Sequence, residues 1–489
     1  MVQLADDPTR RGFFAPMRFE ADIYDCEIVG SIPRDLNGAF VRVGGDWLYS
    51  SKFGPADSPF NEDGYISAFR FKNGSVDFKG RWIKTPRFLA DRAAGRQLFG
   101  LYRNPFTDDP SVKGLDRTVM NTSPFAFDGK LFALKEDARP YQIDPRTLET
   151  IGPWDFHGTY ASPTFTAHPK LDPMTGELVC YGYETGGLAS DDFNLCTIGR
   201  DGRVKREVRL KVPYVTMLHD IGLTQKHVVI PGGGYTTSME RLKAGKIHWA
   251  WDRTKPSYVG IIPRDGDAKD VRWFKGPERG TIHTFNARTE GNKVILEAPV
   301  FDSNPFPFFP AVDDKPWNPQ AARAFIRRQT FDLNSRRDTF TEEIVFPQPL
   351  GNDLVRIDTR YFSLPYRYGF VGYADQSKPF DEARAGNLRG RVTNSYGRYD
   401  FATGKLDLLF AGNAHSLAEC CFVPRKKDAP EGDGYLLGVA SNYAEMRSEL
   451  LIADAQRLAD GPIARVILPF RSSAQVHGTW VADDELSFG

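Results

Sequence analysis

The chain has 489 residues, of which 41% are hydrophobic and 13% aromatic, and this composition excludes a disordered protein because it supplies a large core. Basic and acidic side chains number 63 each, which argues against nucleic acid or an anionic membrane as the main partner. No run approaches the roughly 18 apolar residues of a membrane span, and the N-terminus has no apolar signal-peptide core. We therefore expect a protein without a membrane anchor. Five scattered cysteines form no CxxC motif, which predicts a reducing cytoplasm and no thiolate metal site.

Short strand-like runs joined by turn residues dominate the sequence. In the first example, Tyr65–Phe71 meets Asn73-Gly74 before Ser75–Ile83 returns, and Asn-Gly supplies the positive φ values that a tight hairpin turn needs. Five further turns of this kind separate paired runs: Asp128-Gly129, Asp172–Gly176, Asp201-Gly202, Glu290–Asn292 and Ala402–Gly404. We therefore predict antiparallel hairpins along the whole chain.

The roughly even spacing of these hairpins over so long a chain favours an all-β propeller with decorating loops over a sandwich or a barrel. No segment has the composition of a linker, so we predict one domain over residues 1–489. Short helices are predicted at Pro319–Arg327 and Ser441–Leu450. The segment Arg92–Arg117 is rich in Gly, Asp, Pro and Arg, and we expect it to be a loop that covers a functional site with Tyr102 and Phe106 at its tip.

Histidines are the side chains in this sequence best suited to bind a metal. None of the eight lies at helical spacing from another, so the sequence has no local metal-binding motif. In a propeller, however, inner strands from distant segments converge on one axis, and four histidines can surround one ion. Neutral imidazoles suit Fe, Zn, Cu and Ni. The alternative for each is a neutral core histidine with a backbone partner, and spacing alone leaves both interpretations open.

Nine segments of the chain match the motifs of one enzyme family in that family's order: Ile32–Gly45, Glu62–Gly64, Leu131–Glu136, Ala167–Leu178, Met217–Asp220, His283–Ala287, Arg356–Tyr368, Glu419–Arg425 and His477–Trp480. On these segments the chain resembles the carotenoid cleavage oxygenase family, and it is most similar to the lignostilbene dioxygenase branch. The resemblance implies a seven-bladed propeller capped by loops and short helices, with one non-haem Fe(II) on the axis and O2 as cosubstrate. It carries the four iron ligands over to these positions: His168, His219, His283 and His477.

The same resemblance implies carboxylate partners for three of the ligand histidines. Each ligating imidazole needs an acceptor for its other N–H, because that hydrogen bond fixes the tautomer. The matching positions are Glu136, Asp353 and Glu419. Asp353 stands where the family pattern has Glu, so its shorter side chain predicts either a shifted backbone or a water-bridged contact. The alternative for each acid is a solvated loop charge.

The resemblance also implies the residues that choose the substrate. Tyr102 and Lys135 match positions that hold a phenolic hydroxyl, Phe60 matches a ring that stacks on the substrate, and Phe306 either lines the tunnel or packs in the core. Lys135 and Glu136 are consecutive, so on a strand they face opposite ways. A buried ammonium facing a polyene would cost several kcal/mol, whereas a phenol offers it a partner. Lys135 therefore favours a phenolic substrate, unless it is an ordinary exposed lysine.

These positions favour a dioxygenase that cleaves the central C=C bond of 4-hydroxystilbenes, such as lignostilbene, into two aromatic aldehydes of the vanillin type. Closure through a dioxetane or through an epoxide-like species stays open. The alternatives are cleavage of a phenylpropene side chain, as in isoeugenol, cleavage of an apocarotenoid, or a metal-free propeller that acts as a binding scaffold. The sequence leaves the preferred ring substituents open, and a homodimer agrees with the usual symmetry of soluble enzymes.

Overall fold

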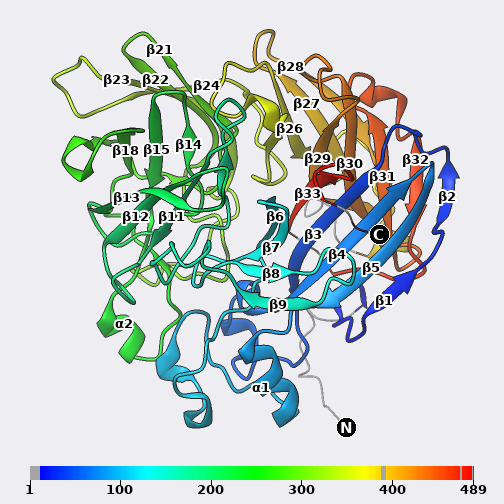
Figure 1. Ribbon diagram of the computed structural model, residues 1–489, viewed down its shortest axis with the longest axis horizontal. Coiled ribbons are helices and arrows are strands. Elements are labelled where there is room, and N and C mark those ends of the chain that lie inside the picture. Colours follow the sequence, from blue (N-terminus) through cyan, green and yellow to red (C-terminus); the bar gives the residue numbers. More distant parts are fainter. Residues whose placement is uncertain (1–11, 387–392, 474–475, 487, 489) are drawn as a thin grey trace.

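Seven antiparallel sheets of four or five strands follow one another around a common axis in this computed structural model, which describes residues 12–386, 393–473, 476–486 and 488 (Figure 1). A separate two-stranded sheet, β16 (Tyr235–Thr236) with β17 (Ala250–Trp251), lies outside the seven. The arrangement is a seven-bladed β-propeller, so the predicted fold class is confirmed.

The first four blades occupy most of the N-terminal half of the chain. Blade 1 comprises, from the axis outward, β33 (His477–Ala482), β3 (Gly38–Asp46), β4 (Asp63–Lys72), β5 (Ser75–Trp82) and β1 (Ala21–Ile23). Blade 2 comprises β6 (Ser123–Phe127), β7 (Lys130–Leu134), β8 (Tyr141–Ile143) and β9 (Thr150–Pro153). Blade 3 comprises β10 (Lys170–Leu171), β11 (Leu178–Tyr183), β12 (Asp192–Ile198) and β13 (Val204–Lys211). Blade 4 comprises β14 (Gly222–Leu223), β15 (His227–Gly232), β18 (Tyr258–Pro263) and β19 (Arg272–Lys275).

The last three blades complete the ring. Blade 5 has two short inner strands, β20 (Gly280–Thr281) and β21 (Asn286–Glu290), both paired with β22 (Lys293–Phe301), followed by β23 (Ala324–Asp332) and β24 (Thr341–Ile344). Blade 6 comprises β25 (Arg356–Ile357), β26 (Tyr368–Tyr373), β27 (Ser395–Asp400) and β28 (Lys405–Phe410). Blade 7 comprises β29 (His415–Pro424), β30 (Gly434–Asn442), β31 (Arg447–Asp454), β32 (Ala464–Ile467) and β2 (Glu27–Gly30).

The ring is closed by strands exchanged between the two ends of the chain. The C-terminal strand β33 pairs with β3 and forms the inner edge of blade 1. The N-terminal strand β2 pairs with β32 and forms the outer edge of blade 7. Each end of the chain therefore completes a blade built mainly from the other end, which leaves fewer unpaired strand edges at the closure.

The predicted turns join neighbouring strands within the blades. Asn73 and Gly74, which link β4 to β5, have φ values of 54° and 91°, so both adopt the left-handed conformation that Asn and Gly tolerate best. Asp128 and Gly129 repeat this geometry between β6 and β7, with φ values of 51° and 65°. The hairpin predictions at these turn residues are confirmed.

Both helix predictions are wrong. In Ser441–Leu450, β30 ends at Asn442 and β31 begins at Arg447, and these two residues pair across a hairpin turn. The segment contains the turn, where Ala444, Glu445 and Met446 are good helix formers, and strand pairing overrides this local propensity. Pro319–Arg327 instead runs through turns into the start of β23, whose burial alternates along most of its length.

The α-helices of the described residues are α1 (Pro86–Ala94), α2 (Met239–Lys243) and α3 (Glu382–Ala385), and α1 and α2 lie at the lower edge of the view (Figure 1). The start of α1 is capped by Thr85, whose hydroxyl accepts from the backbone N–H of Phe88, and Gly95 ends it with a φ of 68°. The segment predicted as a loop, Arg92–Arg117, thus begins inside a helix and continues through short turns.

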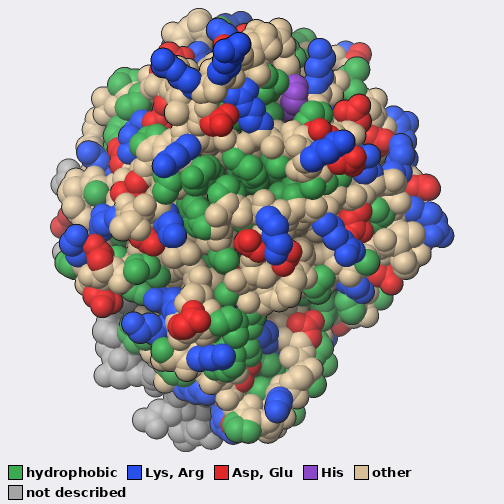
Figure 2. Space-filling view, turned by 90° about the vertical axis from the view of Figure 1, so that its left-hand side faces the viewer, with side chains coloured by type: hydrophobic (Ala, Val, Ile, Leu, Met, Phe, Trp, Pro, Cys, Tyr) green, Lys and Arg blue, Asp and Glu red, His purple; other side chains and the backbone are tan. Residues whose placement is uncertain are grey.

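Hydrophobic clusters fill the spaces between blades. Phe40 of blade 1 and Leu437 of blade 7 share one such cluster and are fully buried, and burying a side chain of this size contributes about 1.5–3 kcal/mol. All five cysteines are buried free thiols. Basic and acidic side chains are interspersed over the face drawn in Figure 2, where hydrophobic side chains also gather across the middle. In the described part of the chain, no helix has the length and apolarity to cross a membrane.

Candidate metal centre and adjoining cavity

Four histidine side chains meet near the propeller axis. One nitrogen from each lies within 4.8 Å of the others in the cluster: His168, His219, His283 and His477. The Nε2 atom of His219 lies 2.9 Å from that of His168 and 3.2 Å from that of His283. The Nε2 atoms of His283 and His477 are 3.3 Å apart. The sequence prediction that distant histidines converge on one point is therefore realised in the geometry.

Three of these rings each have a carboxylate oxygen at their Nδ1 atom. Asp353 Oδ2 accepts from Nδ1 of His283 at 2.9 Å, and Glu419 Oε1 accepts from Nδ1 of His477 at 2.9 Å. Glu136 Oε1 makes a short contact with Nδ1 of His219. The Asp353 contact is direct, so the shorter side chain needs no bridging water.

Each blade supplies one member of this seven-residue arrangement, from within one of its inner strands or from the residues next to it. In blade order the members are His477, Glu136, His168, His219, His283, Asp353 and Glu419. Most of them stand just before a short inner strand or within one, and Glu136 stands two residues after β7. Strand ends that converge on one axis therefore assemble a site from residues up to several hundred positions apart.

The carboxylates determine which imidazole nitrogen carries the proton. A carboxylate is an acceptor only, so Nδ1 of each partnered histidine must donate, and in the neutral ring Nε2 keeps a bare lone pair. When the rings are neutral, at least three lone pairs face one another across about 3 Å, and a cation at their centre would remove this repulsion. Neutral imidazole nitrogen suits Fe, Zn, Cu and Ni. The donor set therefore fits a first-row transition metal.

Burial keeps two of the imidazoles neutral. It lowers the pKa of His477 to about 4 against the pull of Glu419, and it lowers the pKa of His168 well below the usual range together with repulsion from the other three rings. His283 shifts the other way, because the attraction of Asp353 outweighs burial and raises its pKa. For Glu136, burial favours the protonated form, but the attraction of His219 outweighs it and holds the pKa well below the usual range.

A cavity of about 440 Å³ adjoins the histidine cluster. Its wall includes His219, His283 and His477, together with Lys135 and Tyr102. Aromatic side chains from separate segments complete it: Phe14, Phe60 and Phe306. The volume is within the range of small-molecule sites, and the mixture of an apolar wall with a few polar groups is typical of them.

Lys135 is buried, with 3% of its surface exposed, and the alternative of an exposed strand lysine is wrong. Its Nζ donates to Asn121 Oδ1 at 2.7 Å and to the backbone oxygen of Phe60 at 3.1 Å. The ring centroids of Tyr102 and Phe60 lie 5.3 and 5.8 Å from it. Burial lowers its pKa, although Glu136 and Asp137 act in the opposite direction.

Tyr102 reaches the cavity from the segment Arg92–Arg117, whereas Phe106 of the same segment is 50% exposed. The backbone N–H of Tyr102 donates to Asp57 Oδ1 at 3.0 Å. The next residue, Arg103, forms a buried ion pair with Glu184 at 2.6 Å. Burial raises the pKa of the Tyr102 phenol far above its usual value, so its O–H stays neutral.

The aromatic residues after β22 divide between cavity and core. Phe306 lines the cavity, and its ring centroid lies 5.2 Å from that of Phe60 in an edge-to-face contact. Phe309 is fully buried and packs in the core cluster instead. Of the two interpretations given for Phe306, the position on the cavity wall is the one that the structure shows.

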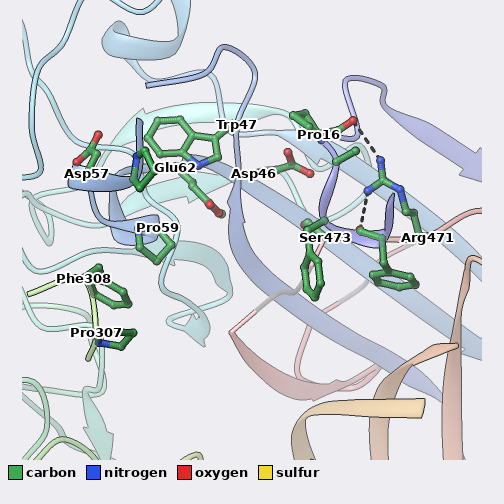
Figure 3. A pocket seen from close by; sticks show the side chains of 15 residues that line it. Pro16, Asp46, Trp47, Asp57, Pro59, Glu62, Pro307, Phe308, Arg471 and Ser473 are labelled. Carbon is green, nitrogen blue, oxygen red and sulfur yellow. Dashed lines mark hydrogen bonds between the residues drawn. The ribbon is translucent and has the colours of Figure 1, made fainter. Parts of the chain in front are cut away.

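A second cavity of about 410 Å³ lies beside the first and shares Phe14, Gly45, Pro59 and Glu62 with it (Figure 3). Arg471 crosses one side of it and donates to the backbone oxygens of Phe13 at 3.0 Å and Pro16 at 3.3 Å. The N-terminal segment that carries Phe14 is therefore tied down beside both cavities.

Some residues of the site were missed in the sequence. Asn121 and Thr122 line the cavity, and Asn121 contacts Lys135 directly. The only signal was their position just before the predicted strand that opens blade 2, and that position does not distinguish a cavity residue from a turn residue.

The fold and the site define a class of protein: a seven-bladed β-propeller with four clustered histidines near its axis. Residues 14–482 match the family described as retinal pigment epithelial membrane protein. The chain is 41% identical to isoeugenol monooxygenase of Pseudomonas putida, with 97% of this chain and 98% of the relative covered. It is 40% identical to lignostilbene-alpha,beta-dioxygenase isozyme III of Sphingomonas paucimobilis, with 99% of both covered.

A solved structure agrees with these sequence matches. The crystal structure of Pseudomonas brassicacearum lignostilbene dioxygenase superposes with a TM-score of 0.94 at 39% identity, covering 99% of this chain and 100% of that one. The chain belongs to the retinal pigment epithelial membrane protein family, which is the carotenoid cleavage oxygenase family. Its relatives are named monooxygenases and dioxygenases, and the chain is an oxidoreductase.

Proposed function

We propose that this protein is a non-haem Fe(II) dioxygenase that cleaves the central C=C bond of 4-hydroxystilbenes with O2 and releases two aromatic aldehydes. The observation that carries the proposal is one cavity whose wall includes both three of the four clustered histidines and the buried Lys135 ammonium. The likeness to lignostilbene dioxygenases in sequence and fold supports it.

The four clustered histidines would hold the iron, with Glu136, Asp353 and Glu419 fixing three of the rings. When bound there, Fe(II) supplies the binding and activation of O2. The four neutral ligands leave its charge uncompensated and leave coordination positions open.

Lys135 and Tyr102 would bind the phenolic oxygen of the substrate. An ammonium has three N–H donors, and two of those of Lys135 find acceptors among the residues described, so the third can donate to a phenolate in the cavity. Tyr102 adds a neutral O–H donor. Both favour the ionised phenol, whose charge is delocalised through the para position onto the alkene and makes its carbon a better electron donor.

Phe60 and Phe306 would position the substrate ring and keep water from it. Their edge-to-face contact leaves apolar ring surface along the cavity wall. The reaction balances with O2 alone: the C=C bond and the O–O bond break, and each new aldehyde receives one oxygen atom. No further reductant or cosubstrate acid is required.

We also propose that residues 1–489 work as one domain. Arg92–Arg117 covers the cavity, because it carries Tyr102. We place the protein in the cytoplasm, as a possible homodimer that acts on a small aromatic substrate.

A second candidate is cleavage of a phenylpropene side chain. Two relatives, at 41% and 40% identity, are named isoeugenol monooxygenase, so identity alone favours neither substrate. A phenylpropene with a para hydroxyl would use the same Lys135 contact. Incubation with a hydroxystilbene, isoeugenol and an apocarotenal, with the aldehydes quantified, separates the candidates.

The activation role is tested with Lys135→Met, which removes the ammonium but keeps the length of the side chain. We expect turnover of the hydroxystilbene to fall by about 100-fold, because a charge-assisted hydrogen bond of roughly 1.5–3 kcal/mol is lost, while iron content stays near one per chain. Near-normal turnover in this variant would overturn the account of substrate activation.

A further inference from the structure

Both acceptors described for the Lys135 ammonium are electrically neutral. One is the backbone oxygen of Phe60, and the other is the side-chain amide oxygen of Asn121 at 2.7 Å. A buried ammonium is more often paired with a carboxylate, which neutralises it. Here the side chain that lies against it provides a dipole and no charge.

The orientation of the Asn121 amide is determined by its partners. Nδ2 donates to the backbone oxygens of Phe60 at 3.1 Å and Glu62 at 2.8 Å. Oδ1 accepts from Lys135 and, at 3.4 Å, from the Thr122 hydroxyl. A flipped amide would set N–H groups against the ammonium and oxygen against two carbonyls, so only one orientation satisfies every partner.

The Phe60 carbonyl that shares this contact is itself held firmly. Phe60 lies in the short turn Pro59–Asn61, where Ser58 Oγ accepts from its backbone N–H at 3.1 Å. Arg87 donates to Asn61 Oδ1 at 2.6 Å and to the backbone oxygen of Asn61 at 2.8 Å. Asn121 thus links this hydrogen-bonded turn to Lys135.

We propose that Asn121 is a positioning residue that holds the Lys135 ammonium toward the cavity without neutralising it, so that the site selects the ionised form of a phenol. Asn121 is 4% exposed and lies on the cavity wall, with both ends of its amide engaged. The inference rests on the proposed function, since it assumes that Lys135 binds the phenolic oxygen. It extends that function by assigning the preference for a phenolate to a residue that acts on the substrate through Lys135.

An acidic residue at this position would behave differently. Asn121→Asp keeps the size of the side chain but places a carboxylate at hydrogen-bond distance from Nζ, so the ammonium would be paired before any ligand arrives. The carboxylate would also face the backbone oxygens of Phe60 and Glu62, to which it cannot donate a hydrogen bond. Asn121→Leu keeps the volume but removes every hydrogen bond, so the ammonium keeps its charge and loses its alignment.

The test measures phenolate binding directly, with the iron-loaded protein and 4-nitrophenol as the probe. This phenol has no alkene to cleave, and its ionised form is followed by its yellow absorbance. The native protein is expected to bind the ionised form and to lower the apparent pKa of the bound probe below its solution value. In Asn121→Asp that apparent pKa should return toward the solution value by about one pH unit, a tenfold change in preference. In Asn121→Leu the affinity for the ionised probe should fall by about tenfold.

Asn286→Asp is the matched control. Asn286 is a buried amide of blade 5 that also donates to two backbone oxygens, those of Tyr361 at 2.8 Å and Leu364 at 3.0 Å, but it lies away from the cavity. It should lose stability as Asn121→Asp does and bind the probe as the native protein does. Probe binding is divided by the folded fraction of each variant, so that unfolding is not mistaken for a lost preference for the ionised probe.

Lys135→Met separates the inference from the function on which it rests. If Lys135→Met loses the phenolate preference and both Asn121 variants keep it, the inference is overturned and the proposed role of Lys135 stands. If Lys135→Met binds the ionised probe like the native protein, both are overturned. The inference is supported only when Lys135→Met and the two Asn121 variants lose the preference and Asn286→Asp keeps it.

Discussion

The histidine rings show how single residues shape the proposed metal site. The tautomer of three rings follows from Glu136, Asp353 and Glu419, because a carboxylate behind Nδ1 leaves Nε2 without a proton. Metal affinity therefore depends on residues that do not touch the metal. A change in any of these acids should alter binding more than its distance from the ion suggests.

Glu136→Gln tests this dependence. The variant keeps an acceptor near His219 but loses the charge that holds Nδ1 protonated, so we expect iron affinity to fall by about 10–100-fold. Iron titration of the metal-free protein measures it. Glu149→Gln, at a side chain that is 47% exposed, serves as the control. Unchanged affinity in Glu136→Gln would contradict the role assigned to the carboxylate.

Individual site residues were predictable to different degrees. The histidines, Glu136 and Glu419 stand in motifs whose order is distinctive, and Asp353 stands just before one, so they could be located without a structure. Asn121 could not, because its partners Phe60, Glu62 and Lys135 lie up to 61 positions away and only the fold brings them together. Contacts between loops depend on tertiary packing, which leaves no local pattern.

At the scale of elements, a buried polar network anchors the segment that carries Tyr102. Arg103 donates to Glu184 Oε2 at 2.6 Å and to the Tyr183 hydroxyl at 3.0 Å. His248 lies 3.0 Å from Glu184, and all of these side chains are buried. The network connects the Arg92–Arg117 segment to blade 3, so its loss should loosen Tyr102 as well as destabilise the fold.

Glu184→Gln should lower the free energy of unfolding by about 3–5 kcal/mol at neutral pH, because it leaves the Arg103 guanidinium buried without its carboxylate. Denaturant unfolding measures this difference. Glu177→Gln, in a more exposed ion pair with Lys205, should cost less than about 1 kcal/mol. Equal losses in the two variants would mean that burial of the pair is unimportant.

The same network makes stability depend on pH. His248 and Arg103 outweigh burial and lower the pKa of Glu184 to about 2, from an ordinary value of 4.5. Since the folded pKa is the lower one, the advantage of the native protein over Glu184→Gln is complete above pH 4.5 and is lost as the pH falls toward about 2. Unfolding measured from about pH 7 downward should show the gap narrowing only on the acid side. A gap that widens there would contradict the sign.

Arg471 ties an N-terminal element to the cavity rim (Figure 3). Arg471→Met removes donors to Phe13 and Pro16, and we expect faster proteolysis within this segment but a loss of only about 1 kcal/mol in global stability, because the side chain is only partly buried. Timed proteolysis with fragment mass analysis measures it. Arg146→Met, at an exposed position, should leave the cleavage rate unchanged.

Elements differed in how readily the sequence predicted them. Turns such as Asn73-Gly74 could be predicted, because their backbone conformation restricts the residue type. The hairpin at Ser441–Leu450 was taken for a helix, because its turn contains the helix formers Ala444, Glu445 and Met446 and strand pairing overrides their propensity. The pairing of β33 with β3 joins residues more than 400 positions apart and has no local signal.

At the scale of the whole molecule, a metal in the cluster would link blades 1, 3, 4 and 5 through one ion. A ligand that binds only the folded state stabilises it by about 2.7 kcal/mol at 100 times its Kd. Chelation of the iron should therefore lower the Tm by about 2–3 °C, and His219→Ala should show little response to the chelator. Differential scanning calorimetry measures both responses. An unchanged Tm of the native protein in the presence of the chelator would contradict a stabilising metal.

The strand exchange that closes the ring also sets an order of events during synthesis. His477 begins β33, so the ribosome has already made the other six blades before the last member of the cluster exists. A nascent chain can bury its early hairpins, but it cannot offer four histidines to a metal. The proposed iron would therefore gain its fourth histidine ligand only after translation is complete and the ring has closed.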